Sequence, residues 1–445
     1  MDGIVNTLLY LFLSLLGLSG DGGYDAGNKG MNHYVSGRQP IDISVNEAMV
    51  NRFYSLNHQQ LYWFSLDKGA ILRRQSFKNC LDSSSYLGLD KMKYHYREIS
   101  EHTGDLYLPE DSLRSRQMDR IFTDAALMFG LDIYRGAEIG KWMNTDDISS
   151  SFYLQDESYI ITQMLEAGKS GNMDLFLSSL EPRDSGYKSL SSALKNDIDS
   201  AGSPGYLFLI SSINQFRWLH HFNFEKFVVV NIPSATLCYY EFDSVRLKMK
   251  VVLGKPSTRT PRFSAYCDQI ILFPYWNVPH SIAVNEYLPM FKRMPGLVTS
   301  LNMQILDDHG NIIPEDNMNW SLYSKVYFPY RLRQSTGCDN ALGVMKFNLT
   351  SPYDVYMHDT NMKPAFNSDY RFYSHGCIRL EKPFELANYM LDTPLDTNIL
   401  NKGLKDQNPK SISLPRKIPV FIVYMCAEAT GGQVKFYPDI YKLLK

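Results

Sequence analysis

The chain has 445 residues, of which 44% are hydrophobic and 13% aromatic, and its 45 basic side chains nearly balance 47 acidic ones. A chain of this length and apolar content normally folds into two or three globular domains, which excludes disordered and collagen-like classes. The balanced charge and the lack of a dense basic run argue against a nucleic-acid partner.

The N-terminus carries an apolar run from Leu8 to Leu18, which has the length of a signal-peptide core and is short for a membrane span. We therefore expect residues 1–20 to be a signal peptide or membrane anchor and residues 21–40 to be a linker. Asp2 stands where a signal peptide would carry a basic residue, so a buried first helix remains an alternative. The expected location is the periplasm, by export or by anchoring in the inner membrane.

Residues 41–222 show helical periodicity. In "DRIFTDAALMFGLDIYRG" the apolar residues Phe122, Ala126, Phe129 and Ile133 recur at helical spacing. Polar connectors separate this stretch from similar ones, and no constellation of titratable residues stands out. The pattern predicts a helical scaffold domain without chemistry of its own.

The pattern changes near Phe224. "FVVVNIPSATLCYYEFDSVRLKMKVVLGKP" alternates valine and aromatic residues between turn signals, which predicts consecutive antiparallel strands. Further strands are predicted at 269–273, 326–330, 344–347 and 355–358, with a hairpin at Gly431-Gly432. The long, proline-punctuated stretch from Trp276 to Lys325 breaks this rhythm and is expected to form an insertion over the sheet. The fold class is therefore α+β, with a β-rich domain over residues 223–445.

The stretch "YSHGCIRL" raises the question of what Cys377 does, because it can be a nucleophile, a metal ligand, half of a disulfide or a small buried residue. A thiol attacks as its thiolate and needs a base nearby and donors for the oxyanion that follows. His375 and His358 are candidate bases, and Gly376 allows backbone amides to approach a bound carbonyl. Arg379 would share a face with Cys377 in an extended segment.

Two other interpretations stay open at this point. His358, His375 and Cys377 would suffice for a catalytic zinc site with an open position, although no H-x-E arrangement supplies an acidic base. The six cysteines contain no C-x-x-C pair, and their disulfide connectivity does not follow from their spacing. As a free thiol, Cys338 could pair with Cys377 under oxidation.

The segment "MHDTNMKPAFNSDYRFYSHGCIRL" resembles the signature of L,D-transpeptidases with a YkuD-type catalytic domain. That signature is a histidine, a spacer, then Ser/Thr-His-Gly-Cys followed by an apolar residue and Asn or Arg. "FPYWNVPHSIA", "PYRLRQSTGCDNALGVMKF" and "VKFYPDIY" are similar to the large murein cross-linking branch with a helical scaffold. The resemblance implies a YkuD-like catalytic domain with a capping insertion at about 277–325. The interval from Leu194 to Ile213 is too short for the peptidoglycan-binding module that this branch often carries.

The resemblance also implies roles for single residues. Cys377 would be the nucleophile and His358 its base, oriented by the backbone carbonyl of Asp359, whose side chain could equally cap the turn. His375 would support the site, and the Gly376 and Cys377 amides would bind the oxyanion. The residues expected to bind substrate are Arg379, Trp276, Asn277, Arg331, Arg333 and Asp359, with Tyr275 and Gln334 beside them. A solvent-exposed strand face would explain Arg331 and Arg333 equally well.

The reaction that the resemblance implies is acyl transfer. Cys377 would attack a peptidoglycan tetrapeptide stem, expel D-alanine and pass the acyl group from its thioester to the amine of a second stem, giving a 3→3 cross-link. Hydrolysis would instead make the protein an L,D-carboxypeptidase or endopeptidase, and a non-catalytic cell-wall binding protein is the third alternative. The expected partners are donor and acceptor stems and carbapenem-type inhibitors. We expect no cofactor and no metal.

Overall fold

The computed structural model describes residues 46–105, 112–143, 148, 152–168, 172–197, 202–242, 244–337, 339–396 and 407–444. The expected signal or anchor, the linker and Cys338 lie outside these residues. In the ranges that are described, no helix combines the length and the apolar character that a membrane span requires.

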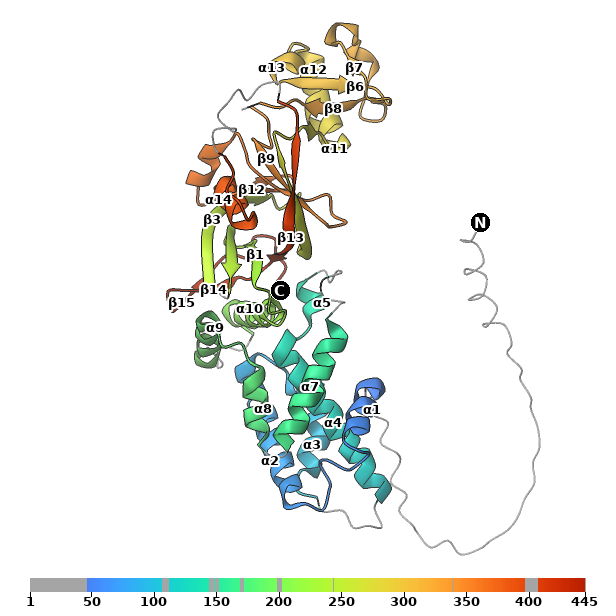
Figure 1. Cartoon of the computed structure of the whole chain (residues 1–445), viewed down its shortest axis with the longest axis vertical. Coiled ribbons are helices and arrows are strands. Elements are labelled where there is room, and N and C mark those ends of the chain that lie inside the picture. Colours follow the sequence, from blue (N-terminus) through green and yellow to red (C-terminus); the bar gives the residue numbers. More distant parts are fainter. Residues whose placement is uncertain are drawn as a thin grey trace, which may run out of the picture. The chain divides into compact units, whose positions relative to one another are not determined.

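The first half of the described chain is helical, and its helices run from blue to green in Figure 1. The longest, α4 (Ser112–Arg135), is buried along most of its length, and the predicted apolar series Phe122, Ala126, Phe129 and Ile133 lies in its core. The other helices are α1 (Glu47–Leu56), α2 (Lys68–Asp82), η1 (Ser84–Leu87), η2 (Lys91–Lys93), α3 (Tyr96–His102), α5 (Ile139–Trp142), α7 (Tyr153–Gly168), α8 (Met173–Leu180), α9 (Ser185–Asn196) and α10 (Pro204–His220). The predicted helical region is confirmed.

A buried carboxylate fastens the start of this region to α4. Asp119 of α4 is 0% exposed and accepts hydrogen bonds from the Tyr54 hydroxyl and from the backbone N–H groups of Tyr62, Trp63 and Phe64. These four donors satisfy a charge that would be costly to bury alone. The non-helical segment after α1 therefore has a fixed position against α4.

Helix α10 joins the helical half to the β-rich half. Ser203 caps its N-terminus and Pro204 occupies its first turn, where a missing N–H costs nothing. The side-chain amide of Gln215 donates to the Tyr424 carbonyl at 2.9 Å and accepts from the Tyr424 N–H at 2.8 Å. Trp218 of the same helix packs on Phe421, with ring centroids 5.2 Å apart. The helix thereby covers part of the sheet through polar and apolar contacts together.

The β-rich half is built on a nine-stranded sheet with the order β11-β3-β12-β10-β9-β4-β13-β1-β2, and β2 also pairs with β3, so the order closes on itself. The predicted antiparallel run after Phe224 is confirmed as β1 to β3, and Gly431-Gly432 forms the turn of the β14–β15 hairpin with positive φ at both glycines. Helix α14 (Pro383–Met390) packs against the core, and η8 spans Lys363–Asn367. The strands are β1 (Lys226–Asn231), β2 (Thr236–Glu241), β3 (Ser244–Gly254), β4 (Phe263–Leu272), β9 (Met345–Leu349), β10 (Met357–His358), β11 (Phe372–Ser374), β12 (Ile378–Leu380), β13 (Lys410–Val423), β14 (Ala427–Thr430) and β15 (Gln433–Phe436).

The expected insertion folds around a hydrophobic core and a four-stranded sheet of its own, in the order β5-β8-β6-β7. The strand predicted at 326–330 is wrong, because this segment is irregular and the strand β8 occupies Arg331–Gln334 instead. The insertion therefore continues past residue 325 and includes β8. Its elements are β5 (Trp276–Asn277), α11 (His280–Ile282), the π-helix η5 (Ala283–Tyr287), α12 (Leu288–Arg293), α13 (Leu297–Ser300), β6 (Met303–Leu306), β7 (Ile312–Ile313), η6 (Glu315–Asn317) and η7 (Trp320–Leu322).

Candidate active site

Three neighbouring strands of the main sheet set up one polar face. Met357 of β10 lies opposite Phe347 of β9 and Ile378 of β12, and all three side chains are buried in the core. The next position along β10 is His358, which pairs with Lys346 on one side and Arg379 on the other. Because successive side chains of a strand point to opposite faces, Lys346, His358 and Arg379 form a row on the face away from that core.

Tyr356 and Cys377 lie two residues before His358 and Arg379, so the same alternation brings them to this face. The Ile378 N–H donates to the Tyr356 carbonyl at 3.1 Å, which fixes the two segments side by side. The backbone N–H and the hydroxyl of Tyr356 lie close to the Cys377 sulfur and act to lower its pKa, and the thiol contacts the Asp354 carbonyl with sulfur and oxygen 3.9 Å apart. The indole of Trp276, from the insertion, lies close to the Tyr356 hydroxyl. The nucleophile predicted from sequence therefore has a tyrosine neighbour that sequence analysis did not single out.

His358 is buried, and a backbone carbonyl fixes its tautomer. It is 4% exposed, and its Nδ1 lies 2.5 Å from the carbonyl oxygen of Asp359. A carbonyl can only accept, so Nδ1 carries the proton and Nε2 keeps its lone pair. Burial, with the positive charge of Arg379 as the second cause, lowers the pKa of His358 to about 3. The imidazole is therefore uncharged at neutral pH and can take a proton.

Cys377 rests as a thiol. It is half-buried, and burial raises its pKa above the usual value, while hydrogen bonds from Tyr356 and the charges of Lys346 and Arg379 act in the opposite direction. The Cys377 thiol and the His358 imidazole are therefore both neutral and lie on the same face of the sheet. The cations of this face favour the thiolate over the thiol.

Two cations on this face have no carboxylate partner among the residues that the structure describes. Lys346 lies over the ring of Tyr356, with its amine 4.1 Å from the ring centroid. Arg379 contacts Met362 through Nη1 at 3.6 Å, and its Nε is buried with no hydrogen-bond partner in the described chain. Burial lowers the pKa of both side chains, as expected for charges removed from water without a counter-ion. The pair can receive an anionic group of a ligand.

The loop before Cys377 is fixed by its own polar groups. Ser374 donates to the Cys377 carbonyl at 2.6 Å and accepts the Gly376 N–H at 3.1 Å, while Thr260 donates to the Gly376 carbonyl at 2.8 Å. Gly376 has a φ of +122°, which a residue with a side chain rarely adopts. Its amide was expected to bind an oxyanion, but this amide is already engaged with Ser374. The Cys377 amide was also expected to bind the oxyanion, and the Tyr356 hydroxyl near the sulfur is a further candidate donor.

His375 is directed toward the insertion. Its Nε2 lies 2.6 Å from Oε1 of Glu286, which belongs to the π-helix η5. In the described part of the chain, no three histidine, cysteine or acidic side chains are grouped so that they could hold a metal ion. His358, His375 and Cys377 are therefore not arranged as the zinc alternative requires. Cys377 and the other four described cysteines are free thiols.

Asp359 was expected to bind substrate, and this prediction needs correction for its side chain. The carboxylate is buried, accepts the Val344 N–H at 3.0 Å and pairs with Lys363. A Cβ atom added at Gly343 would lie 2.2 Å from this carboxylate, so only glycine fits there. The side chain holds the turn, whereas the Asp359 carbonyl orients His358.

The remaining predicted substrate-binding residues lie in the insertion. Trp276 reaches the site through Tyr356, and its strand neighbour Asn277 is exposed and pairs with Arg333. Arg333 stacks on Tyr275, 4.4 Å from the ring centroid, and donates to Gln304 of β6. Arg331 donates to the Asp307 carbonyl at 3.2 Å. Trp276 is thus tied to the site directly, while both arginines contact residues of the insertion's own sheet.

Tyr356, Lys346 and Glu286 were missed from sequence. The alternation in "GVMKFN" and "DVYMH" places Lys346, Tyr356 and His358 on the faces opposite their buried neighbours, so the pattern was available. It becomes informative only with the pairing of β9, β10 and β12. Glu286 gave no such signal, because its role depends on how the insertion folds.

Comparison with known proteins assigns both halves of the chain. Residues 225–406 match the family model of the L,D-transpeptidase catalytic domain, YkuD, and residues 48–194 match that of the Scaffold domain. A curated protein of Haemophilus influenzae named "Putative L,D-transpeptidase" is 35% identical over 220 residues, which are 49% of this chain and 45% of that relative. The chain thus matches less than half of the relative's length.

Solved structures with similarity to the chain include two L,D-transpeptidases. One is from Mycobacterium smegmatis, with 15% identity, a TM-score of 0.21 and coverage of 44% of this chain and 58% of the other. The second is the catalytic domain from E. faecium acylated by ertapenem, with 14% identity, a TM-score of 0.21 and coverage of 44% and 96%. The chain therefore contains a region that matches the YkuD L,D-transpeptidase catalytic domain, preceded by a region that matches the Scaffold domain.

Proposed function

We propose that the protein is a cysteine acyltransferase that forms 3→3 cross-links between peptidoglycan stem peptides through a thioester on Cys377. The observation that carries the proposal is the convergence of Cys377, Tyr356 and a neutral His358 on one face of the β10–β12 pair. The YkuD match supports the reaction class.

Acylation follows from this arrangement. The sulfur of Cys377 attacks the carbonyl at the L-centre of the donor stem while its proton passes to Nε2 of His358. The oxyanion accepts hydrogen bonds from the Cys377 amide and the Tyr356 hydroxyl. When the tetrahedral species collapses, the carbon–nitrogen bond to D-alanine breaks and His358 returns the proton to the leaving amine. The product is a thioester and free D-alanine.

Deacylation uses the same groups in reverse order. The side-chain amine of the acceptor stem attacks the thioester and loses its proton to His358, and the Cys377 thiol is regenerated. Arg379 and Lys346 hold a stem carboxylate during both steps, since neither has a carboxylate partner within the described residues. The Trp276 contact brings the insertion to the site, where it limits the access of water to the thioester.

Location and inhibition belong to the same proposal. Peptidoglycan stems are reached from the periplasm, and the apolar run from Leu8 to Leu18 predicts export or anchoring. A carbapenem presents a strained acyl group to the same thiol and is expected to acylate Cys377.

The test is incubation of the purified protein with disaccharide-tetrapeptide, followed by mass analysis of the products. Cross-linked dimer together with released D-alanine supports the proposal, and the Cys377→Ala variant should give none. Tripeptide without dimer would show a carboxypeptidase instead. Unchanged substrate with a correctly folded protein would point to a non-catalytic wall-binding protein.

A further inference from the structure

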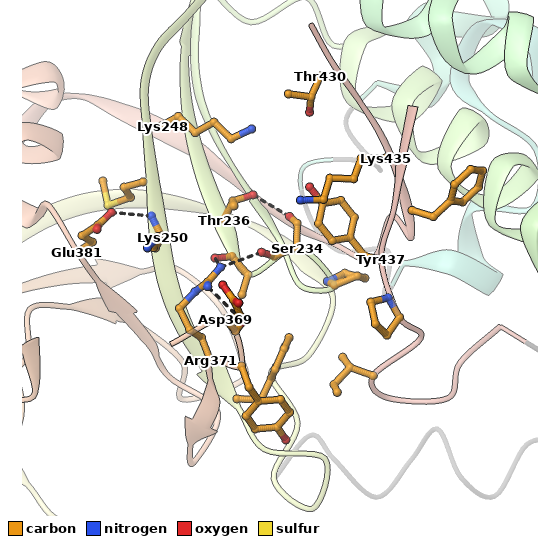
Figure 2. A pocket seen from close by; sticks show the side chains of 18 residues that line it. Ser234, Thr236, Lys248, Lys250, Asp369, Arg371, Glu381, Thr430, Lys435 and Tyr437 are labelled. Atoms are coloured by element: carbon orange, nitrogen blue, oxygen red, sulfur yellow. Dashed lines mark hydrogen bonds between the residues drawn. The ribbon is translucent and has the colours of Figure 1, made fainter. Parts of the chain in front are cut away.

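The β-rich half contains a hollow whose lining does not include Cys377. It has a volume of about 890 Å³ and lies between β2, β3, the segment 369–372 and the β14–β15 hairpin (Figure 2). Glu381, which lines it, follows β12, whereas Cys377 precedes that strand. Four residues of extended chain span about 13 Å, so the hollow and the nucleophile lie at opposite ends of β12. We call this hollow the hairpin pocket.

The hairpin pocket is cationic. Its lining includes Lys248, Lys250, Arg371 and Lys435 against Asp369 and Glu381. Figure 2 shows the amines of Lys248 and Lys435 directed from two sides toward the space between β3 and the hairpin. No carboxylate forms an ion pair with either lysine in the part of the chain that the structure describes, although Lys248 also lies near Glu428 behind the wall. The charge favours an anionic ligand.

Arg371 forms part of the wall of the hairpin pocket, and hydrogen bonds to backbone carbonyls hold it in place. It is 7% exposed, and its guanidinium donates only to carbonyl groups, those of Ser234, Ala235, Ser368 and Asp369. Its Nε is buried and has no hydrogen-bond partner within the described residues. Carbonyls fix the guanidinium in place, and the nearby carboxylates of Asp369 and Glu381 offset part of its charge, so the positive charge that faces the pocket comes mainly from Lys248 and Lys435.

Hydroxyl groups of the pocket offer acceptors. Glu428, behind the wall, accepts hydrogen bonds from Asn231, Ser234 and Tyr437. The hydroxyls of Ser234 and Thr236 lie 2.7 Å apart, and either can be the donor. The hydroxyl oxygens of Thr236 and Tyr437, which line the pocket, can accept hydrogen bonds from a ligand with hydroxyl donors.

Aromatic rings form the rim. Phe436 of the hairpin is 48% exposed and Tyr370 is 44% exposed, and both line the pocket. Exposed rings beside hydroxyl acceptors suit the apolar face and polar edges of a pyranose. A bare anion such as phosphate would use the lysines but neither the rings nor the acceptors.

We propose that the hairpin pocket binds an anionic saccharide, and that its ligand is a glycan unit of the peptidoglycan that carries a carboxylate-bearing stem. This inference rests on the proposed function for the choice of polymer. Binding there would hold the glycan while Cys377 acts on a stem, and it needs no group of the active site.

The experiment measures binding of disaccharide-tetrapeptide by calorimetry to protein whose Cys377 is already acylated by a carbapenem, so that the stem site is filled. Phe436→Ala and Lys248→Glu should each weaken binding by about tenfold. The matched controls Phe242→Ala, an exposed ring elsewhere, and Lys417→Glu, an exposed lysine of β13, should bind as the wild type does. Free tetrapeptide and neutral N-acetylglucosamine tetramer should both bind about tenfold more weakly than the complete ligand.

Binding that is absent, or unaffected by both pocket variants, would overturn the proposal, as would equally tight binding of the neutral sugar or the free peptide. Carbapenem acylation of Phe436→Ala and Lys248→Glu should stay at the wild-type rate. If acylation persists while pocket binding fails, the pocket proposal is wrong and the proposed function stands. If no protein is acylated, the proposed function fails, and the same binding series on Cys377→Ala still decides for or against the pocket.

Discussion

Two buried polar clusters of the chain differ in how far their groups are satisfied. In the helical half, the Asp119 carboxylate receives four hydrogen bonds from Tyr54 and the segment 62–64. On the catalytic face, the Nε of Arg379 is buried without a hydrogen-bond partner among the described residues, and Lys346 faces a tyrosine ring. A buried charged group whose hydrogen-bonding positions are all occupied stabilises the fold. Groups that converge on one place and lack such partners are available to bind a ligand.

The same contrast separates the two histidines near Cys377. His358 keeps Nε2 available, because only its Nδ1 is engaged, with the Asp359 carbonyl. His375 points Nε2 at Glu286 of the insertion. The histidine nearer in sequence therefore links the site to the insertion, and the more distant one is the base in the proposed mechanism.

Loss of the base should give the largest effect. In His358→Gln an amide replaces the imidazole, so no group can accept the thiol proton. We expect the second-order rate of carbapenem acylation to fall by about 10³-fold, followed by stopped-flow absorbance of the carbapenem. His309→Gln, an exposed histidine of the insertion, is the control and should react normally. A fall of less than fivefold in His358→Gln would remove His358 from the mechanism.

Loss of the Asp119 carboxylate, whose four hydrogen bonds hold the helical half together, should lower the free energy of unfolding and leave the acylation rate unchanged. Asp119→Asn keeps the shape but replaces one acceptor oxygen with a donor that faces backbone N–H groups. We expect about 3 kcal/mol less free energy of unfolding in urea. The exposed Asp308→Asn should change it by less than about 0.5 kcal/mol. At temperatures where Asp119→Asn remains folded, its acylation rate should match the wild type, and a slower rate would contradict the division between the two clusters.

Removal of the Tyr356 hydroxyl tests the catalytic face more finely. Tyr356→Phe keeps the ring under Lys346 but removes the hydroxyl near the Cys377 sulfur, which is the proposed donor to the developing oxyanion. We expect acylation to slow by about 10²-fold with little change in thermal stability. The control is Tyr327→Phe, on an exposed ring of the insertion. A rate equal to the wild type would assign Tyr356 to packing.

The pH dependence should show the smallest change. An ordinary histidine base would lose activity as pH falls through about 6.5, because protonation removes its lone pair. With its pKa lowered to about 3, His358 stays neutral, so the acylation rate should be nearly flat from pH 5 to pH 8. Above that range the rate should rise as the Cys377 thiol ionises, since its pKa is raised. An inflection of the acylation rate between pH 6 and pH 7 would contradict a neutral Cys377 thiol and a neutral His358 imidazole at rest.

The sequence predicted the order of the two halves and the chemical core of the site, because these depend on local patterns. The Ser-His-Gly-Cys segment and the strand before it drew attention to Cys377 and His358; His358 ends β10, and Cys377 directly precedes β12, which pairs with β10. Lys346 and Tyr356 were missed, because their alternation becomes informative only with the pairings between strands far apart along the chain. Arg331 and Arg333 were expected beside the substrate, but the register of the insertion's sheet directs them to Asp307 and Gln304.

The most direct test of the central claim is the intact mass of the protein after incubation with a carbapenem. We predict a single covalent adduct on the wild type, localised by peptide mapping to Cys377, and no adduct on Cys377→Ala at the same concentration and time. An adduct that persists in Cys377→Ala, or an unmodified wild-type protein, would contradict the assignment of Cys377 as the nucleophile.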